Sequence, residues 1–598
     1  MILQNLNAPS DVKKLNKQEL SALAEDIREE IVSVASNNGG HLSSNLGILE
    51  TTVALYKTFD FPKDKLIFDV GHQCYAHKIL SGRREEFKTI RTAGGLSGFP
   101  DAEESDFDLF TTGHAGNSIA LGLGLCAARD KNNEDYYVIT VVGDGALVNG
   151  LNLEAVNVAS EKPKKFIVIL NDNGMSISKN RNGFYNFISK ATAKRSYVKN
   201  KNVIKRIFGN SFIAVFFRKV RDFFKRLINK GEYFERFGFK YVGVVDGNNL
   251  EETTKMLARV KNVADYKAVF LHIKTTKGKG LKNAEEHADL YHSVGKNMKL
   301  ACSEEFALGK VLSELIDKDD KIMAITAGMK DGTGLDALDK THPDHLVDVG
   351  IAEEYAATVA AGMAKGGLKP VVAVYSTFLQ RAYDEIMQDV CLQNLPVIFC
   401  IDRAGFTGED GKTHQGLFDL SYTLHIPNMT VIAITSKREL KAALEYAISL
   451  NSPVCIRYSK SCADSDYVSD YKDGSWQVIK EGSDLTVFAV GKNALKLACE
   501  FSEKYGKSVK VVAARVIKPL DEKMLSSVDT PIITIEENVI SGGFGAMVAA
   551  FYADKTPRKI HILGVKDKFV KHGSIKEQLV ENGFTTQNLT AIADGLLK

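Results

Sequence analysis

Short runs of apolar residues alternate along this chain with longer amphipathic segments. Between residues 65 and 175 the runs KLIFDVGHQ, YYVITVVGDG and KKFIVILNDN are separated by helical patterns. Runs that are apolar throughout indicate strands buried on both faces, because half-exposed strands alternate polar and apolar positions. We therefore predict parallel strands joined by helices. A helix is predicted before them, over residues 20–60, with the stretch GGHLSSNLGILE interrupting it.

The same pattern returns twice farther along the chain. One series runs from KIMAITAGM through PVVAVYSTF, PVIFCIDRAG and MTVIAITS to SPVCIRYS, after a polar stretch near 282–303 that is typical of a linker. Another begins near residue 465 with DLTVFAVG, SVKVVAARVIKPLDE and PIITIEENV. We predict an α/β protein of three consecutive doubly wound domains. Their predicted boundaries are 1–297, 298–465 and 466–598.

One segment of the first domain departs from this pattern. Residues 194–230 hold twelve Lys and Arg and a single acidic residue, Asp222, with aromatic residues between them. We interpret the segment as part of a basic insertion over about 183–232. A membrane-surface helix or a lid over a site would have this composition, but an amphipathic excursion packed on the body is the interpretation we favour.

Composition narrows the class of protein. The 598 residues are 44% hydrophobic and 25% charged, and the net charge of +3 points to no nucleic-acid partner. No apolar run approaches the length of a membrane span, and the first twenty residues lack the apolar centre of a signal peptide. The eight cysteines include no C-x-x-C pair. We expect a cytoplasmic protein without a disulfide framework and without a membrane partner.

Two of the predicted strands end in polar residues suited to a cation. Gly143-Asp144-Gly145 follows YYVITVV, and Asn171-Asp172-Asn173 follows KKFIVIL. Ligands bind at the carboxyl ends of parallel strands, and neighbouring ends would bring Asp144 and Asn173 together. A carboxylate, an amide oxygen and a backbone carbonyl suit Mg²⁺ when phosphate oxygens and water complete its octahedron. Gly-Asp-Gly alone is more often a plain turn, so the pairing with Asn173 carries the prediction.

Several longer segments resemble one family. DVGHQCYAHKILSGR, GDGA, NDNGMSIS, YSTFLQRAYDEI, DRAGFTGEDGKTHQGLFDLSY and RVIKPLDE look like the 1-deoxy-D-xylulose-5-phosphate synthase family of the transketolase-like enzymes. The resemblance extends over nearly the whole chain. It implies the transketolase-like thiamine-diphosphate-binding fold, a homodimer, and decarboxylative condensation of pyruvate with D-glyceraldehyde 3-phosphate. The product would be 1-deoxy-D-xylulose 5-phosphate, a precursor of isoprenoids, thiamine and pyridoxal phosphate.

The resemblance also implies a cofactor site for thiamine diphosphate and Mg²⁺. Asp144, Asn173 and the main-chain carbonyl of Met175 would bind the metal. The residues expected to contact the organic cofactor are His72, Gly113, His114, Ala115, Gly145, Ala146, Asn173, Glu353 and Phe378. In the family this cofactor lies between the first two domains of one subunit.

Glu353 is the acidic residue that the resemblance places beside the aminopyrimidine ring. A carboxylic acid there favours the imino form of the ring, which then removes the reactive proton of the cofactor; that work needs a raised pKa in a dry pocket. A glutamate near a helix start can instead be a solvated partner of the helix dipole. Phe378 matches the aromatic residue stacked on the ring, with plain core packing as the alternative.

Other matched residues surround the reacting centre and the acceptor. His41, His72, His292 and His414 match histidines that orient substrate or move protons near neutral pH, although an isolated histidine is more often structural. The remaining substrate residues expected from the resemblance are Tyr375, Arg381, Arg403, Asp410 and Lys460. Arg403 could alternatively be a structural ion-pair residue.

The chain departs from the family pattern at several positions. Tyr355 stands where a histidine is usual, GHAGNS replaces Gly-His-Ser-Ser, and Leu281 replaces a common tyrosine. Lys460 stands for an arginine that holds the substrate phosphate; it keeps the charge but loses the bidentate fork, so we expect weaker phosphate binding. Two alternatives therefore stay open: a transketolase-like enzyme with another donor or acceptor, and a cofactor-binding paralogue with little catalysis.

Overall fold

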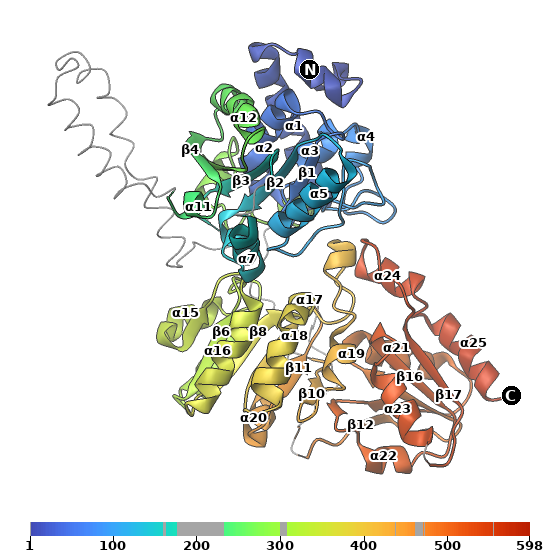
Figure 1. The fold of residues 1–598 in the computed structure, drawn as a ribbon. Helices are drawn as coiled ribbons and strands as arrows, with labels where there is room; N and C mark the ends of the chain where they lie inside the picture. The colour runs from blue at the N-terminus through green and yellow to red at the C-terminus, as the bar shows by residue number, and fades with distance from the viewer. Residues whose placement is uncertain are drawn as a thin grey trace, which may run out of the picture. The chain divides into compact units, whose positions relative to one another are not determined.

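The computed structural model describes residues 2–159, 163–175, 232–299, 308–436, 438–460, 471, 473–553 and 555–598. It divides the chain into two compact units, one formed by residues 1–90 and 98–301 and the other by 91–97 and 302–598 (Figure 1). The first unit holds one sheet and the second holds two. The predicted three-domain division at 297 and 465 stays a prediction. Most of the basic insertion lies outside the described residues.

The first unit is built on a parallel five-stranded sheet in the order β1-β2-β3-β5-β4. Its strands are β1 (Lys65–Phe68), β2 (Val138–Gly143), β3 (Phe166–Asp172), β4 (Lys240–Asp246) and β5 (Val269–Lys274). All seven residues of β3 are buried, as its uninterrupted apolar run predicts. Because Gly143 pairs with Asn171, β2 and β3 end side by side. This edge of the sheet is where the predicted metal ligands lie.

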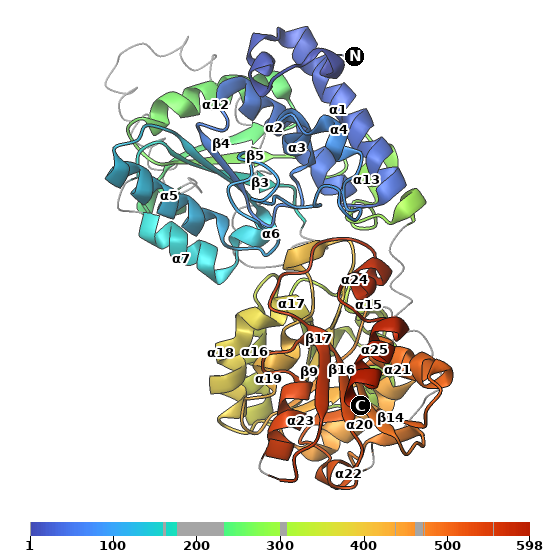
Figure 2. The same cartoon turned by 90° about the vertical axis from the view of Figure 1, so that its right-hand side faces the viewer.

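Helices cover both faces of this sheet. α2 and α12 pack together on one face, whereas α5 and α7 pack on the other (Figure 2). The helices are α1 (Lys17–Asn38), α2 (Leu42–Thr58), α3 (Tyr75–Leu80), α4 (Arg84–Phe87), α5 (Ser118–Asn132), α6 (Asp144–Leu147), α7 (Gly150–Val158), α11 (Glu232–Arg236), α12 (Leu250–Ala264) and α13 (Lys282–Glu286).

The interruption of the predicted helix over 20–60 is narrower than the sequence suggested. α1 ends at Asn38 and α2 begins at Leu42, so most of the stretch GGHLSSNLGILE is helical. The break is made by Gly39, whose φ of +80° ends α1, and Gly40, with φ of +141°. A side chain on Gly39 would also meet the Val294 carbonyl at 2.8 Å. His41 is thereby left at the start of α2.

The second unit contains a seven-stranded and a five-stranded sheet. The first has the order β15-β10-β11-β9-β8-β6-β7, with β6 (Ile322–Thr326), β7 (Leu346–Asp348), β8 (Lys369–Tyr375), β9 (Ile398–Asp402), β10 (Thr430–Ala433), β11 (Val454–Arg457) and β15 (Val516–Lys518). The other has the order β12-β14-β13-β16-β17, with β12 (Gln477–Lys480), β13 (Leu485–Val490), β14 (Val509–Ala513), β16 (Ile532–Val539) and β17 (Ile560–Val565).

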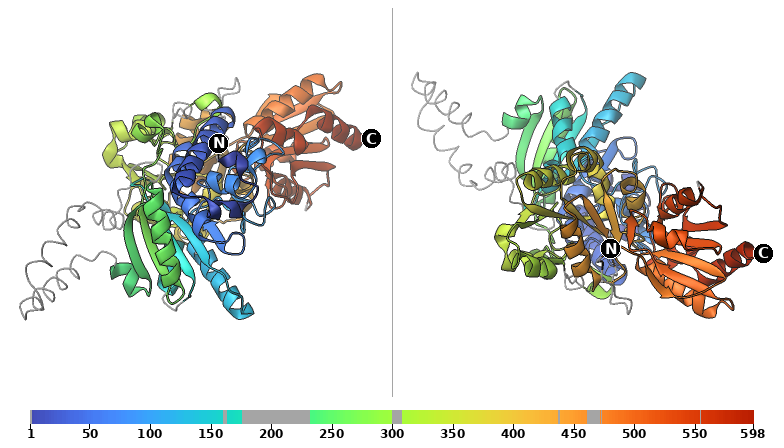
Figure 3. Two further views of the ribbon diagram at one scale, coloured as in Figure 1. Left: turned by 90° about the horizontal axis from the view of Figure 1, so that it is seen from above. Right: turned by 90° about the horizontal axis from the view of Figure 1, so that it is seen from below.

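Strand β15 ties the two sheets of this unit together. It follows β14 of the C-terminal sheet but pairs antiparallel with β10 of the other sheet. The views along the vertical axis show the C-terminal sheet, in orange and red, as a layer of its own (Figure 3). The helices are α14 (Leu308–Ile316), α15 (Asp336–Thr341), α16 (Glu353–Lys365), α17 (Ser376–Leu379), α18 (Tyr383–Glu385), the π-helical turn η9 (Ile386–Cys391), α19 (Asp419–Thr423), α20 (Glu439–Leu450), α21 (Lys492–Lys504), α22 (Glu522–Ser526), α23 (Phe544–Ala553), α24 (Ile575–Glu581) and α25 (Thr586–Leu596).

Among the described residues, no helix combines the length and the apolar character that crossing a bilayer requires.

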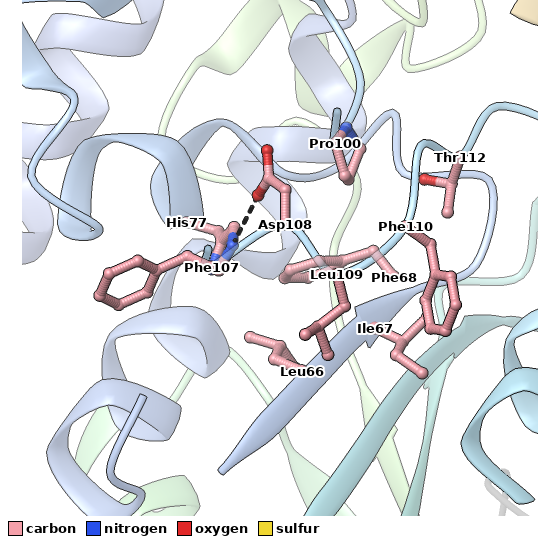
Figure 4. A pocket seen from close by; sticks show the side chains of 10 residues that line it. All are labelled: Leu66, Ile67, Phe68, His77, Pro100, Phe107, Asp108, Leu109, Phe110 and Thr112. Carbon is pink, nitrogen blue, oxygen red and sulfur yellow. Dashed lines mark hydrogen bonds and ion pairs between the residues drawn. The ribbon is translucent and has the colours of Figure 1, made fainter. Parts of the chain in front are cut away.

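A buried charge cluster in the first unit holds the chain that leads to the Gly113–Ala115 segment. Asp108 accepts two hydrogen bonds from Arg83, at 2.6 and 2.9 Å, and lies 3.1 Å from His77 Nε2 (Figure 4). His77 Nδ1 is in turn 3.0 Å from the Tyr56 hydroxyl, and Asp108 also accepts from the backbone N–H of Asp101. Burial alone would raise the pKa of Asp108, but the hydrogen bonds from His77 and Arg83 hold it far below its usual range.

We predict that Asp108→Asn lowers the free energy of unfolding by about 3 kcal/mol at pH 7, because the buried Arg83 would keep only its longer ion pair with Glu104, at 3.7 Å. The depressed pKa means that the native carboxylate stabilises the fold above pH ~4 and that this contribution is lost as the pH falls further. Urea unfolding at pH 7 and at pH 3 checks both statements. The exposed Asp106 gives the control Asp106→Asn. Equal stabilities for the two variants at pH 7 would contradict the prediction.

Candidate active site

The predicted metal ligands of the first unit lie together at the ends of β2 and β3. Asp144 is 3% exposed, and its carboxylate accepts hydrogen bonds from Gly145 N at 2.9 Å and from Gly174 N at 2.8 Å. The second bond joins Asp144 to the turn that carries Asn173 and Met175. Burial raises the pKa of Asp144 to about 7, and the negative charge of Asp172 adds to the rise.

A buried network behind this turn was not predicted from the sequence. His272 Nε2 lies 3.0 Å from Asp172 Oδ2, and His272 Nδ1 lies 2.8 Å from the Tyr241 hydroxyl. The three residues come from β3, β5 and β4, which are neighbours in the sheet. Asp172 also accepts from Gly174 N at 3.2 Å, so the network orients the same turn that Asp144 holds. The first five residues of β5 are all buried, so the apolar run gives no sign that His272 differs from an ordinary core residue.

Lys277 is a second residue that sequence reasoning missed. It follows β5 and is 4% exposed. Burial lowers the pKa of its ammonium group to about 8, although the nearby carboxylates of Asp144 and Asp289 favour the charged form. A buried ammonium group near Asp144 adds positive charge where an anionic ligand is expected.

The loop that carries Gly113, His114 and Ala115 is anchored by Asp69. The Asp69 carboxylate accepts from Gly116 N at 2.8 Å, from Ser118 N at 3.0 Å and from Asn152 Nδ2 at 3.2 Å. Asn152 Nδ2 also donates to the carbonyl of Ala146 at 2.9 Å, which ties this loop to the segment after Asp144. Asp69 is the first residue of the motif DVGHQ, so the sequence marked this position, but the motif alone did not predict that Asp69 anchors the loop.

The three histidines of this unit that are predicted around the reacting centre form a compact group. The ring centroids of His41 and His72 are 5.4 Å apart, those of His41 and His292 5.6 Å, and those of His72 and His292 5.3 Å. His292 Nδ1 also lies 3.3 Å from the Ser44 hydroxyl. Residues separated by 250 positions in the sequence therefore lie around one point.

Asn45 holds two of these histidines through their backbones. Its amide nitrogen donates to the carbonyl of His41 at 2.6 Å and to the carbonyl of His72 at 2.7 Å, while its oxygen accepts from Tyr75 N at 2.8 Å. Paired hydrogen bonds between Gly40 and Val294, at 2.8 and 2.9 Å, bring in the segment that carries His292. The histidine group is thus positioned by backbone contacts, which no side-chain pattern reveals.

In the second unit, Glu353 is the first residue of α16 and is 6% exposed. Burial raises the pKa of its carboxyl group to about 7, and the positive charge of Arg381 opposes the rise only in part. Within the described residues, its Oε2 atom is buried and has no hydrogen-bond partner. Because Glu353 is buried, it is not the solvated partner of the helix dipole that was the alternative interpretation of this residue. The arrangement instead provides a carboxyl group that can hold a proton near neutral pH.

Two of the other predicted residues of this unit form an aromatic pair, and two more lie against it. The rings of Tyr375 and Phe378 are stacked at 5.8 Å, and His414 meets the Phe378 ring edge-on at 5.6 Å. The Arg403 guanidinium lies over the Tyr375 ring at 4.0 Å. Arg403 also forms an ion pair with Asp402 and donates to the Gly332 carbonyl at 2.7 Å. Arg403 therefore does form the structural ion pair that was the alternative to a role in substrate binding.

The remaining predicted substrate residues lie apart from this pair or beside other charges. Asp410 accepts from Arg91 Nη1 at 2.5 Å, and Arg91 is a residue that sequence reasoning missed. Its carboxylate also lies near His414, whose pKa is lowered by burial. Lys460 Nζ is 3.8 Å from Glu409 and contacts the Thr407 carbonyl at 3.4 Å. Arg381 lies near Glu353.

Comparisons with known proteins define the class first. The pyrimidine-binding domain model of transketolase matches residues 303–464, and the transketolase C-terminal domain model matches residues 474–589. With the parallel sheets described above, these matches make the chain an enzyme of the transketolase type, a transferase.

The particular family follows from the N-terminal match and the relatives. The model described as 1-deoxy-D-xylulose-5-phosphate synthase matches residues 3–275. Proteins named 1-deoxy-D-xylulose-5-phosphate synthase are 44% identical in Carboxydothermus hydrogenoformans, over 98% of both chains, and 43% identical in Clostridium tetani, over 95% of both chains. The chain belongs to the 1-deoxy-D-xylulose-5-phosphate synthase family. A solved transketolase variant, R525L from Pichia stipitis, is 17% identical and covers this whole chain, with a TM-score of 0.42.

The buried Glu353 predicts a pH-dependent cost to the unliganded fold. A carboxyl group whose native pKa is raised from about 4.5 to about 7 destabilises the fold once the unfolded chain ionises, and the cost is complete above pH ~7. We expect Glu353→Gln to raise the free energy of unfolding by about 3 kcal/mol at pH 8 and by less than about 1 kcal/mol at pH 5.

Denaturant unfolding of the cofactor-free protein at these two pH values makes the measurement. Glu354→Gln, one residue farther along α16, is the matched control. A Glu353→Gln variant that is no more stable than wild type at pH 8 would refute the raised pKa.

Proposed function

We propose that the chain condenses pyruvate with D-glyceraldehyde 3-phosphate, releasing CO2 and forming 1-deoxy-D-xylulose 5-phosphate, in the cytoplasm and with thiamine diphosphate and Mg²⁺. The observation that carries the proposal is Glu353, a buried carboxyl group with a raised pKa and an Oε2 atom that no described residue satisfies. Buried polar atoms are nearly always hydrogen-bonded. An unsatisfied oxygen at the first residue of α16 therefore suggests that an atom of a ligand bonds to it. Family membership supplies the reaction.

The residues of the first unit fit a magnesium diphosphate. Asp144 offers one buried carboxylate, Asn173 an amide oxygen and Met175 a main-chain carbonyl, a sparse oxygen set that leaves room for phosphate oxygens and water. Gly145, Ala146 and the Gly113–Ala115 loop offer backbone and small side chains that allow close approach. Lys277 supplies positive charge toward the diphosphate. Asp69 and His272 keep these groups in place.

The second unit fits the aminopyrimidine. When bound, thiamine diphosphate supplies a nucleophilic carbon and an electron sink for the loss of CO2. Glu353 would face the ring nitrogen, and its raised pKa would let its carboxyl group hold a proton there at neutral pH. Phe378, stacked on Tyr375, offers an aromatic face to the ring.

Substrate handling is assigned to the remaining groups. His41, His72 and His292 would orient the donor and move protons around the reacting centre. His414 and Asp410 would contact the acceptor aldehyde. Tyr375, Arg381, Arg403 and Lys460 would bind the acceptor phosphate.

A homodimer is part of the proposal. Tyr355 on α16 is 57% exposed and Leu392, after η9, is 71% exposed, and large apolar side chains are commonly covered in an assembly. Light scattering on the purified chain tests the subunit number: a mass of one chain would contradict the dimer.

The activity itself is tested by following CO2 release from pyruvate by the purified protein with thiamine diphosphate and Mg²⁺. We expect release that depends on D-glyceraldehyde 3-phosphate, and a product with the mass of 1-deoxy-D-xylulose 5-phosphate. Glu353→Gln should lower kcat by at least about 100-fold, whereas Glu354→Gln should leave it near wild type. CO2 release that ignores the acceptor, activity with ketose phosphates instead, or cofactor binding without turnover would overturn the proposal.

Lys460 yields a prediction of improved substrate binding. Its side chain keeps one positive charge but cannot form the two parallel hydrogen bonds of a guanidinium group. We expect Lys460→Arg to lower the KM for D-glyceraldehyde 3-phosphate about fivefold, with the KM for pyruvate unchanged. The same change at Lys496, which pairs with Glu500 on α21, is the control. An unchanged or raised KM for the acceptor would separate Lys460 from phosphate binding.

A further inference from the structure

The chain segment 403–416 carries three of the proposed substrate residues, Arg403, Asp410 and His414. It follows β9 and contains little regular structure besides a single turn of 3-10 helix, Gly411–Thr413. Gly405, Gly408 and Gly411 have φ values of +87°, +94° and +70°, so the backbone needs glycine at three places. Hydrogen bonds within the segment join Gly405 to Gly416 and Thr407 N to Gln415 Oε1. They close the ends of the loop, and contacts with other elements are needed to fix the stretch between them.

The C-terminal part of the chain supplies a pair of reciprocal contacts to this segment. Gln578, in α24, is 2% exposed. Its Oε1 accepts from Gly408 N at 3.1 Å and its Nε2 donates to the carbonyl of Gly408 at 2.9 Å. Nε2 also donates to the carbonyl of Lys571 at 2.9 Å. One planar amide thus pairs with both backbone groups of a single glycine, which fixes its orientation as a strand neighbour would.

Two neighbouring contacts support the same segment. Phe406 N donates to Glu537 Oε2, at the end of β16, at 3.2 Å. Gly411 packs against His572, since a Cβ on Gly411 would lie 3.0 Å from the His572 Cβ. His572 Nε2 is 2.8 Å from the carbonyl of Gly95, in the short segment 91–97 that also brings Arg91 to Asp410.

We infer that the C-terminal domain positions the acceptor-binding segment and that Gln578 is the principal positioning residue. The inference rests on the proposed function. The position of the segment matters for catalysis only if Asp410 and His414 contact the acceptor. Gln578 acts through the backbone of Gly408 and touches no substrate. Its loss would let residues 405–416 move, which weakens acceptor binding while leaving the donor and cofactor residues in place.

The test replaces Gln578 with methionine, which keeps the length and volume of the side chain and removes the hydrogen bonds. Gln587→Met, at an exposed position of α25, is the matched control. Gln578→Glu is a second variant that retains the oxygen accepting from Gly408 N and loses the two donated bonds. Circular dichroism and the melting temperature verify that each variant is folded with cofactor and Mg²⁺ present.

Two readouts are measured on the full-length protein. Hydrogen exchange followed by mass spectrometry should show faster exchange of residues 405–416 in Gln578→Met and Gln578→Glu than in wild type or Gln587→Met. Steady-state kinetics should show a KM for D-glyceraldehyde 3-phosphate raised about tenfold by Gln578→Met, with the KM for pyruvate and the cofactor affinity within about twofold of wild type.

The outcomes separate this inference from the proposed function. Faster exchange together with the selective rise in acceptor KM supports the inference. Hydrogen exchange that is unchanged in the Gln578 variants, or an equal rise in KM for pyruvate and for the acceptor, overturns the inference about Gln578. The proposed function still stands in that case if the wild-type protein is active. Wild-type protein without acceptor-dependent CO2 release overturns both, whereas the exchange data still report whether Gln578 orders the segment.

Discussion

The removal of acidic groups from water is the constraint on which the rest of this structure depends. Asp144 is 3% exposed and Glu353 is 6% exposed. Burial is the main reason that both carboxyl groups have a pKa of about 7. Burying a charge without compensation is costly, so such groups persist where a ligand repays the cost. One group suits a metal ion with a diphosphate, and the other suits a ring nitrogen that must receive a proton.

Supporting residues hold the functional groups of each unit in place. Asp69 and Asn45 act mostly through backbone N–H and carbonyl groups of loops from distant parts of the first unit. Asp172, which is held by His272, accepts from the backbone N–H of Gly174. In the second unit, Gln578 has the corresponding place beside the segment of Asp410 and His414. Reacting groups must be held to a fraction of an ångström, and hydrogen bonds to backbone achieve this more firmly than contacts between flexible side chains.

The parallel strands and the predicted metal ligands could be read from the sequence because each leaves a local pattern. The run YYVITVV gave β2 and KKFIVIL gave β3, and their pairing places Asp144 beside the Asn173 turn. Strands β12 and β17 were not anticipated, since β12 is only partly buried and the first three residues of β17 are exposed or partly buried. The pairing of β15 with β10 depends on contacts 84 and 87 residues apart, as Ile432 pairs with Val516 and Val431 with Lys518. Gln578, Asn45 and Lys277 were missed because each lies next to other polar residues, and hydrophobic periodicity does not distinguish one polar residue from another.

The measurement that tests the central claim most directly is calorimetric titration of thiamine diphosphate into the cofactor-free protein. It should be made with Mg²⁺, with a chelator in place of Mg²⁺, and with Asp144→Asn in Mg²⁺. The account predicts saturable binding with Mg²⁺, at least about tenfold weaker binding with the chelator, and Asp144→Asn behaving like chelated wild type. Equal affinity under all three conditions would contradict the claim that the buried carboxylate at the end of β2 serves a metal and its diphosphate.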